Sequence, residues 1–450
     1  MSKLKESIFL NFVMPVADMK FGTAISRYYR LVKEMSCWTP ERVLQWQTSL
    51  MQARLKHAYE QIPYYTNLFH ELRLKPGDFQ NLKDLTFLPI LTKDIIRTHY
   101  DDLVPRDLSR HPHHKGATGG STGTPMRYLC DNKSWSMTNA FNIFERQSAD
   151  YHYGDQFIAM GGSSISAAAT HSFMHKVYYR VIGKNAMGST GINEEEMHRY
   201  FEFIRSHNIK YIYGYASVIY LFAKYVKENN LQDELDIKAI FPTSDVLANA
   251  YASLIQETLK CKILDSYGAF DGCVSGYRSL WDDNGFKCGY GTYVETDEMI
   301  SPTSGKILVT DLVGRAFPFI RYELGDVVDL DLEKSYSSIH NGQVIRSLQG
   351  RESNMVKLKN GFYISEVSLH NAFKDIHIDG YKVEVEDSKL IVTVIPTGDY
   401  TLQEENAMKQ ILIGRTGGEY DIEIRHKDKL ERRKNGKSLY IMTDNKIITQ

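Results

Sequence analysis

The stretch from Gly116 to Pro125 has the composition best suited to chemistry in this chain. It reads Gly-Ala-Thr-Gly-Gly-Ser-Thr-Gly-Thr-Pro, with four glycines and four hydroxyl-bearing residues. Glycine weakens helices and strands, whereas in a loop it lets backbone N–H groups approach phosphate oxygens and leaves room for hydroxyl donors. The alternative is a flexible linker. Pro125 stiffens the loop, and the strand-like Met126–Leu129 follows at once. Both features favour a phosphate-binding loop.

Two familiar phosphate-binding patterns do not fit this loop. A P-loop needs a lysine and then a serine or threonine after its second glycine, but Gly123 is followed by Thr124 and Pro125. The dinucleotide fingerprint needs glycines at its first, third and sixth positions, and no register of the loop supplies them. The loop is therefore of another kind.

Two carboxylates follow segments that have strand patterns. Lys262–Ser266 leads into Tyr267-Gly268-Ala269-Phe270-Asp271, and the apolar run Lys306–Leu312 leads towards Gly325-Asp326. In open α/β sheets, ligands bind at the carboxyl ends of strands. A carboxylate at such an end accepts two hydroxyl hydrogen bonds, which suits a vicinal diol. Taken alone, each segment also fits an ordinary strand-ending turn.

Near the C-terminus, a basic run presents one lysine at a turn. Residues 430–440 read Leu-Glu-Arg-Arg-Lys-Asn-Gly-Lys-Ser-Leu-Tyr, and such runs are usually solvated. Asn435-Gly436 favours a tight turn, which would place Lys437 at its tip.

Taken in order, these motifs resemble those of the adenylate-forming superfamily. Its phosphate loop, Ser/Thr-Ser-Gly-Thr-Thr-Gly-x-Pro, is similar to Thr118–Pro125, and its Tyr-Gly-x-x-Glu is similar to Tyr267–Asp271. Its Arg-Tyr-x-x-x-Asp is similar to Arg321–Asp326, and its Gly-Arg hinge to Gly350–Asn354. The segment Leu82–Asp94 resembles the phenylacetate–CoA ligase branch, which includes CapK proteins of capsule biosynthesis and coenzyme F390 synthetases.

The resemblance implies roles for individual residues. Lys437 would be the catalytic lysine, Asp271 would help to hold Mg²⁺ in place of the usual glutamate, and Ser353 and Asn354 stand where the hinge acid usually lies. The nucleotide-binding set comprises Thr118, Gly119, Gly120, Ser121, Thr122, Gly123, Tyr267, Gly268, Asp326 and Arg351. The substrate pocket would be formed by Tyr213, Gly214, Tyr215, Ser244 and Asp245.

The implied activity is ATP-dependent activation of a carboxylic acid. The acid and ATP would form an acyl-adenylate and release pyrophosphate, with Mg²⁺ as the metal. The acyl group would then pass to coenzyme A, to a carrier protein, or to an amine of a sugar or amino acid. Two other interpretations stay open, namely adenylyl transfer as the final step and a relative that only binds nucleotide.

Composition is that of an ordinary soluble protein. The 450 residues are 42% hydrophobic and 24% charged, with a formal net charge of −1. This near-neutral balance does not indicate nucleic acid as a partner. Five widely spread cysteines favour free thiols in a reducing cytosol. A homodimer remains open.

Three local features could mislead. The apolar run Ile8–Ala17 imitates a signal peptide, but Asn11 and Pro15 interrupt it and no other run approaches a membrane span. We therefore expect a cytoplasmic protein, with peripheral membrane contact through this run left open. The histidines of residues 111–114 lack partners at ligand spacing, so we expect a solvated loop. Around Cys273 and Cys288 we expect no zinc.

Hydrophobic patterning predicts an α/β fold. From residue 150 to 330, short apolar strands alternate with helices. Strands are expected at 155–161, 210–214, 239–243, 262–266 and 306–312, with helices at 39–62, 215–229 and 247–259. On the helix at 215–229, Val218, Leu221, Phe222 and Tyr225 should share one buried face. A large N-terminal domain of mixed sheets with flanking helices should span residues 1–350. A small α+β C-terminal domain on a hinge should span residues 351–450, with helices at 365–376 and 401–413 and strands at 381–386, 389–395 and 420–427.

Overall fold

The computed structural model describes most of the chain. It covers residues 6–118, 126–161, 179, 182–187, 194–282, 284–300, 303–337, 340–351, 356–357, 363–364, 369, 373, 376–386, 388–416, 418–428 and 441–443. Residues 119–125 of the phosphate loop, Ser353, Asn354 and Lys437 lie outside these ranges. Of Arg351, only the backbone is described.

The chain divides into two compact units. The first comprises residues 1–155, 266–299 and 303–347, and the second comprises residues 156–265, 300–302 and 348–450. The division at residues 350 and 351 stays a prediction, since the second unit joins the C-terminal hundred residues to residues 156–265.

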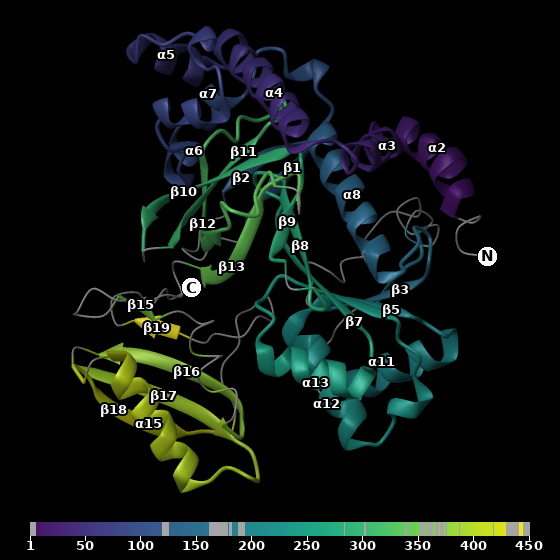
Figure 1. The fold of residues 1–450 in the computed structure, drawn as a ribbon, viewed down its shortest axis with the longest axis vertical. Helices are drawn as coiled ribbons and strands as arrows, with labels where there is room; N and C mark the ends of the chain where they lie inside the picture. Colours follow the sequence, from purple (N-terminus) through teal and green to yellow (C-terminus); the bar gives the residue numbers. More distant parts are fainter. Residues whose placement is uncertain are drawn as a thin grey trace. The chain divides into compact units, whose positions relative to one another are not determined.

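Helices of the first unit come mostly from its N-terminal part (Figure 1). They are η1 (Phe9–Val13), α2 (Met14–Phe21), α3 (Ile25–Met35), α4 (Pro40–Gln61), α5 (Pro63–Glu71), η2 (Pro76–Asp78), η3 (Leu82–Phe87), α6 (Lys93–Thr98), α7 (Tyr100–Leu103), η4 (Leu108–Arg110), α8 (Asn132–Arg146) and η5 (Gln147–Ala149). The predicted start of α4 is confirmed, because the Thr39 side chain accepts a hydrogen bond from the Arg42 N–H and Pro40 occupies the first turn. Thr92 likewise caps α6 by accepting the Ile95 N–H at 3.2 Å.

Strands of the first unit form a hairpin and a larger sheet. They are β1 (His113–Ala117), β2 (Arg127–Asp131), β8 (Val274–Ser279), β9 (Phe286–Cys288), β10 (Thr292–Met299), β11 (Ser304–Asp311), β12 (Tyr322–Leu330) and the first half of β13 (Val344–Arg351). β1 and β2 pair with each other, and the order of the others is β10-β11-β12-β13-β9-β8. Four pairs of neighbouring strands in this sheet are antiparallel, namely β10–β11, β11–β12, β13–β9 and β8–β9.

A buried cation anchors α4 to the loop that precedes β12. Arg54 is fully buried, and its guanidinium donates to the carbonyl oxygens of Gly314 and Phe317. Burial lowers the pKa of Arg54, and the nearby carboxylates of Asp311 and Asp131 oppose this shift. A buried charge is tolerated only when it is paired and hydrogen-bonded, so this loop is held against α4 at a defined position.

The second unit contains a parallel sheet covered by helices. Its elements are β3 (Phe157–Met160), β4 (Lys184–Ala186), α11 (Glu194–His207), β5 (Tyr211–Tyr215), α12 (Ala216–Glu228), η7 (Gln232–Glu234), β6 (Ala239–Thr243), α13 (Asn249–Leu259) and the start of β7 (Lys262–Ala269). The strand order is β4-β3-β5-β6-β7, and these neighbours pair in parallel. In Figure 1, α12 and α13 lie side by side along this sheet. The predicted α/β alternation is confirmed.

The buried face of α12 differs from the prediction. Val218 and Phe222 are buried as expected, but Leu221 and Tyr225 are only partly covered. Ile219 and Val226 are fully buried in their place. The reason is that α12 packs against α11, α13 and the sheet, so its covered surface is not the single face that the spacing predicts.

The C-terminal part of the second unit contains β14 (Val356–Lys357), β15 (Tyr363–Ile364), β16 (Ile378–Glu386), β17 (Lys389–Pro396), α15 (Leu402–Thr416), β18 (Asp421–His426) and β19 (Ile441–Thr443). Four of these strands form a sheet in the order β18-β17-β16-β19. The predicted strands at 381–386, 389–395 and 420–427 and the predicted helix at 401–413 are confirmed. The helix expected at 365–376 lies mostly outside the described residues. An apolar core drawn from residues 369–420 fills the space between α15 and the sheet.

The N-terminal run Ile8–Ala17 is helical and docked. Phe9 packs edge-on against Tyr153 at 5.0 Å, and the Glu6 carboxylate lies 2.8 Å from His152. Phe12 and Met19 point outwards and are 70% and 82% exposed. In the described part of the chain, no helix is long and apolar enough to span a bilayer.

One buried histidine predicts how stability changes with pH. His340 is 8% exposed and stacks on Tyr290, and its Nε2 has no hydrogen-bond partner within the described part of the chain. Burial, and to a smaller extent the charge of Lys287, lower the pKa of His340 to about 3. Below the unfolded pKa of roughly 6.5, the unfolded chain therefore binds a proton that the folded chain does not.

Above that pH, we expect His340 to have no effect on how the free energy of unfolding changes with pH. Below it, protonation of this histidine in the unfolded chain should lower the free energy of unfolding by about 1.4 kcal/mol for each pH unit. His340→Phe keeps an aromatic ring and removes the titration, so its unfolding free energy should fall less between pH 7 and pH 5. Urea unfolding at both pH values tests this, with exposed His70→Phe as the matched control. An unchanged pH dependence in His340→Phe would contradict it.

Candidate nucleotide-binding site

The phosphate loop stands on a β-hairpin. β1 and β2 pair up to Ala117 and Arg127, and the Thr118 N–H donates to the Met126 carbonyl at 3.0 Å. The chain therefore leaves the hairpin at Thr118 and returns at Met126, so residues 119–125 connect its two strands at one end. The predicted strand after the loop is confirmed as β2.

The packing of the hairpin requires a glycine at position 116. Gly116 pairs with Tyr128, and a Cβ on Gly116 would lie 2.4 Å from the Tyr128 ring. The ring therefore lies over the glycine, and it packs edge-on against Phe319 at 5.6 Å. Burial raises the pKa of Tyr128, and the negative charge of Asp271 raises it further. This connects the base of the loop to the predicted metal-binding acid.

Asp271 is tied to β12 by a tyrosine. The fully buried Tyr322 donates from its hydroxyl to Asp271 Oδ2 at 2.8 Å. The same hydroxyl oxygen lies 3.7 Å from Met126 Sδ, at the point where the chain returns from the phosphate loop. Tyr322 thus brings the Tyr-Gly turn and the end of the loop to one place.

Asp326 is presented by a bulge in β12. Lys306 of β11 pairs with Val327, but Leu308 pairs with Glu323, so Leu324, Gly325 and Asp326 lie opposite a single residue. Gly325 has φ of +83°, which suits glycine. Bulges of this kind redirect side chains and are frequent beside functional sites.

A second tyrosine ties Asp326 back to the Tyr-Gly turn. The Tyr267 hydroxyl donates to Asp326 Oδ2 at 2.9 Å. The segments Tyr267–Asp271 and Tyr322–Asp326 are therefore joined twice, since the tyrosine that begins each segment donates to the aspartate that ends the other. The two predicted acids, which are 55 positions apart in the sequence, are thereby held in one framework.

Sequence reasoning missed a lysine beside this framework. Lys93 of α6 donates from Nζ to the Leu324 carbonyl at 2.8 Å, and Nζ lies 3.5 Å from the position of a Cβ on Gly325. Leu91 forms a β-bridge with Tyr322, and this bridge places the start of α6 next to the bulge of β12. The available signal was the Thr92-Lys93-Asp94 helix start in a segment already noted for its resemblance to the ligase branch.

The predicted substrate-pocket residues lie in the second unit and carry local structural roles. Asp245 accepts the Ala216 N–H at 2.8 Å and the Ser217 N–H at 3.2 Å, so it caps α12 from the end of the neighbouring strand. A Cβ on Gly214 would lie 2.1 Å from the Met160 carbonyl oxygen, so glycine permits close strand packing there. Tyr213 and Tyr215 belong to β5, and Ser244 follows β6 with φ of +72°. Their contact with a substrate stays a prediction.

The expectation of a solvated loop at residues 111–114 is wrong for His111. Its Nε2 lies 3.1 Å from Asp107 Oδ2, while His57 Nε2 lies 3.1 Å from Asp107 Oδ1, and all three side chains are largely covered. Burial and the charge of Arg54 lower the pKa of His57 to about 4, so it is neutral near pH 7. Among the described residues, these three could hold a metal ion. His57 is 54 positions away, which is why the sequence did not indicate a partner.

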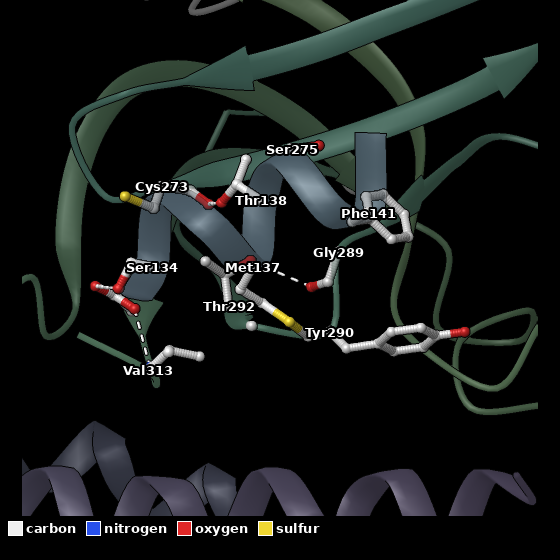
Figure 2. Close-up of a pocket in the computed structure, with 12 residues that line it drawn as sticks. Ser134, Met137, Thr138, Phe141, Cys273, Ser275, Gly289, Tyr290, Thr292 and Val313 are labelled. Carbon is white, nitrogen blue, oxygen red and sulfur yellow. Dashed lines mark hydrogen bonds between the residues drawn. The ribbon is translucent and has the colours of Figure 1, made fainter. Parts of the chain in front are cut away.

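A small cavity lies beside the framework but is not the nucleotide site. Figure 2 shows it between α8, the turn before β8 and the loop that follows β9, with Met137, Phe141, Tyr290 and Cys273 among its lining residues. Its volume of about 10 Å³ has room for one water molecule at most.

Comparison with known proteins agrees with this geometry. No protein-family model matches the chain. Protein CapK of Staphylococcus aureus is 20% identical over 368 residues, covering 80% of this chain and 81% of CapK. The phenylacetate–coenzyme A ligase of Thermus thermophilus is 23% identical over 323 residues, covering 63% of this chain and 66% of that enzyme.

Solved structures show the same fold. A 2-hydroxyisobutyryl-CoA ligase in the postadenylation state aligns with a TM-score of 0.71 at 16% identity, covering 92% of each chain. The anthranilate CoA ligase AuaEII aligns with a TM-score of 0.53 at 13% identity, covering 89% of this chain and 79% of the ligase. The chain is similar in sequence to CapK and to phenylacetate–coenzyme A ligases, and its fold is that of these acyl-CoA ligases.

The two tyrosine–aspartate hydrogen bonds can be tested by double-mutant cycles. Combining Tyr322→Phe with Asp271→Asn should give a coupling energy of roughly 1.5–3 kcal/mol in the free energy of unfolding, as for hydrogen bonds to charged groups. Combining Tyr267→Phe with Asp326→Asn should give a similar coupling energy.

The matched controls are the mismatched pairs, Tyr322→Phe with Asp326→Asn and Tyr267→Phe with Asp271→Asn. Their coupling should be smaller than that of the matched pairs. Equal coupling in matched and mismatched pairs would mean that the four residues stabilise the fold in some other way.

Proposed function

We propose that this chain is an AMP-forming ligase that activates a carboxylic acid with ATP. The carboxylate oxygen attacks the α-phosphorus of ATP, the bond to the β-phosphate oxygen breaks, and pyrophosphate leaves. The coenzyme A thiolate then attacks the acyl carbon, and AMP leaves with its electron pair. The observation that carries this proposal is the pair of Tyr–Asp hydrogen bonds, which holds both acids beside the hairpin of the phosphate loop.

Each part of the site suits one part of ATP. Backbone N–H groups and hydroxyls of residues 118–123 would bind the phosphates. Asp326, oriented by Tyr267 and carried on the bulge, would accept hydrogen bonds from the ribose hydroxyls. Arg351 would contribute a positive charge near the nucleotide.

The residues present fit a magnesium ion. Asp271 is only partly buried, and its recorded side-chain partner, the Tyr322 hydroxyl, is neutral, so this partner orients the carboxylate without cancelling its charge. Carboxylate oxygens are preferred Mg²⁺ ligands, and the bound ion would neutralise phosphate charge. Asp271 is one methylene shorter than glutamate, and Tyr322 fixes the direction in which it reaches.

Coenzyme A is the acceptor that the relatives favour. A phenylacetate–coenzyme A ligase is 23% identical to this chain over 323 residues, and a 2-hydroxyisobutyryl-CoA ligase shares the fold. A carrier protein or an amine of a sugar or amino acid is the alternative acceptor. Lys437 would serve the first half-reaction, and rotation of residues 351–450 about Ser353 and Asn354 would remove it for the second.

ATP–pyrophosphate exchange tests this activity directly. With labelled pyrophosphate, label should enter ATP only when a suitable acid from a panel of aliphatic and aromatic acids is present. Asp326→Ala and Asp271→Asn should each lower the exchange rate, whereas Asp94→Asn, at an 88% exposed carboxylate, should not. Absence of exchange with every acid, in a folded protein that binds ATP, would leave nucleotide binding as the function.

A second experiment separates the two half-reactions. Removing a preorganised cation that faces developing phosphate charge typically lowers a rate by about 10²–10³. We therefore expect Lys437→Ala to lose adenylation to that extent, with ATP affinity nearly unchanged, because the contact strengthens in the transition state.

Acyl transfer from chemically supplied acyl-AMP should survive in Lys437→Ala. Lys434→Ala, three residues earlier in the same basic run, is the control and should keep both half-reactions. Equal loss of both half-reactions in Lys437→Ala would exclude a role in adenylation alone.

A further inference from the structure

Two buried cysteines meet behind the proposed nucleotide site. Cys130 of β2 and Cys273, in the turn that follows Asp271, have their sulfur atoms 3.9 Å apart. Both side chains are buried, and both residues belong to the first unit. A disulfide needs a sulfur–sulfur distance of about 2.05 Å, so the two atoms have to approach by roughly 2 Å. They are 143 positions apart in the sequence, which is why no Cys-x-x-Cys motif indicated the pair.

A histidine accompanies the pair. His114 of β1 lies directly across from Cys130 in the hairpin, so the two side chains project from the same face. A hydrogen bond to Cys130 raises the pKa of His114. Hydrogen bonds from Cys273 and then from His114 lower the pKa of Cys130, against the effect of burial. Thiolate character makes a cysteine more nucleophilic, so Cys130 is the more reactive thiol of the pair once an oxidant reaches it.

We propose that Cys130 and Cys273 form a reversible disulfide that switches the adenylation site off under oxidising conditions. The thiolate sulfur of Cys130 attacks one oxygen of hydrogen peroxide, the O–O bond breaks, and a sulfenic acid and hydroxide form. The sulfur of Cys273 then attacks the sulfenic sulfur, the S–O bond breaks, and a second hydroxide leaves. With the two thiol protons, the balance is two thiols oxidised to one disulfide and one peroxide reduced to two waters.

The surrounding packing transmits this change to the site. Cys273 is two residues after Asp271, and Cys130 is two residues after Tyr128, whose ring lies over Gly116. Gly272, between Asp271 and Cys273, is closely packed, since a Cβ there would lie 2.6 Å from Val309 Cγ2.

The carbonyl of Cys273 is also held, because Thr138 of α8 donates to it at 2.9 Å. Figure 2 shows the two residues side by side at the small cavity. With the backbone held there, drawing the sulfur atoms together has to shift the turn that carries Asp271 or the strand that returns from the phosphate loop. The effect on catalysis rests on the proposed function, whereas formation of the disulfide does not.

To test this, the 450-residue protein is oxidised with a small excess of hydrogen peroxide, and the remaining thiols are blocked. Its peptides are then mapped by mass spectrometry. We expect a cross-linked peptide containing Cys130 and Cys273, and loss of two free thiols. ATP–pyrophosphate exchange should fall at least tenfold and return after dithiothreitol. Cys130→Ser and Cys273→Ser should form no cross-link and should keep their reduced-state activity after peroxide.

Exposed Cys37→Ser is the matched control and should behave like the unmodified protein. A disulfide between other cysteines, or oxidation of Cys130 to sulfinic acid without the cross-link, overturns the proposal. If the cross-link forms and the rate of ATP–pyrophosphate exchange is unchanged, the disulfide does not switch the activity off. If the reduced protein shows no exchange with any acid, the proposed function fails instead, and the peptide map still decides whether the pair forms.

Discussion

The reciprocal hydrogen bonds between Tyr267–Asp271 and Tyr322–Asp326 are the constraint on which the site depends. Each aspartate is oriented by a tyrosine from the other segment. Neither segment could present its acid alone, since one ends a strand in a turn and the other leaves its strand in a bulge. The hydroxyls are neutral donors, so these two hydrogen bonds orient the carboxylates without themselves neutralising them.

The rest of the first unit holds these two segments in place. Arg54 of α4 donates to the loop before β12, and Asp131, which caps α8, accepts the backbone N–H of Arg315 and Ala316 at 2.8 and 3.0 Å. Ser134 of α8 donates to Asp311 at 2.7 Å. These polar contacts are buried, where an unpaired group is costly, so helices and loop have one favourable arrangement. The same rigidity is what would make a change at Cys273 reach Asp271.

The structure also changes how some residues are interpreted. Asp245 was expected to line a substrate pocket, and it caps α12 through two backbone N–H groups. The two roles are compatible, because a carboxylate that is held at a helix N-terminus has a fixed position from which it could also line a pocket. His111 was expected to be solvated, and it is covered by contacts with His57 and Asp107. The partners of Asp245 are 28 and 29 positions away, and of the two partners of His111 it is His57 that is distant in the sequence.

By itself, the sequence determined where strands and helices lie, which loop is rich in glycine, and which acids follow strand ends. Such features depend on a residue and its near neighbours, as in the Thr39 cap of α4 or the alternation of strands and helices from 150 onwards. The resemblance of the ordered motifs to a family added their expected roles. Only the tertiary structure decided which tyrosine orients which aspartate, that Lys93 reaches Leu324, and that Cys130 meets Cys273. These contacts join residues 51 to 231 positions apart, and they depend on how whole elements pack, which no local pattern encodes.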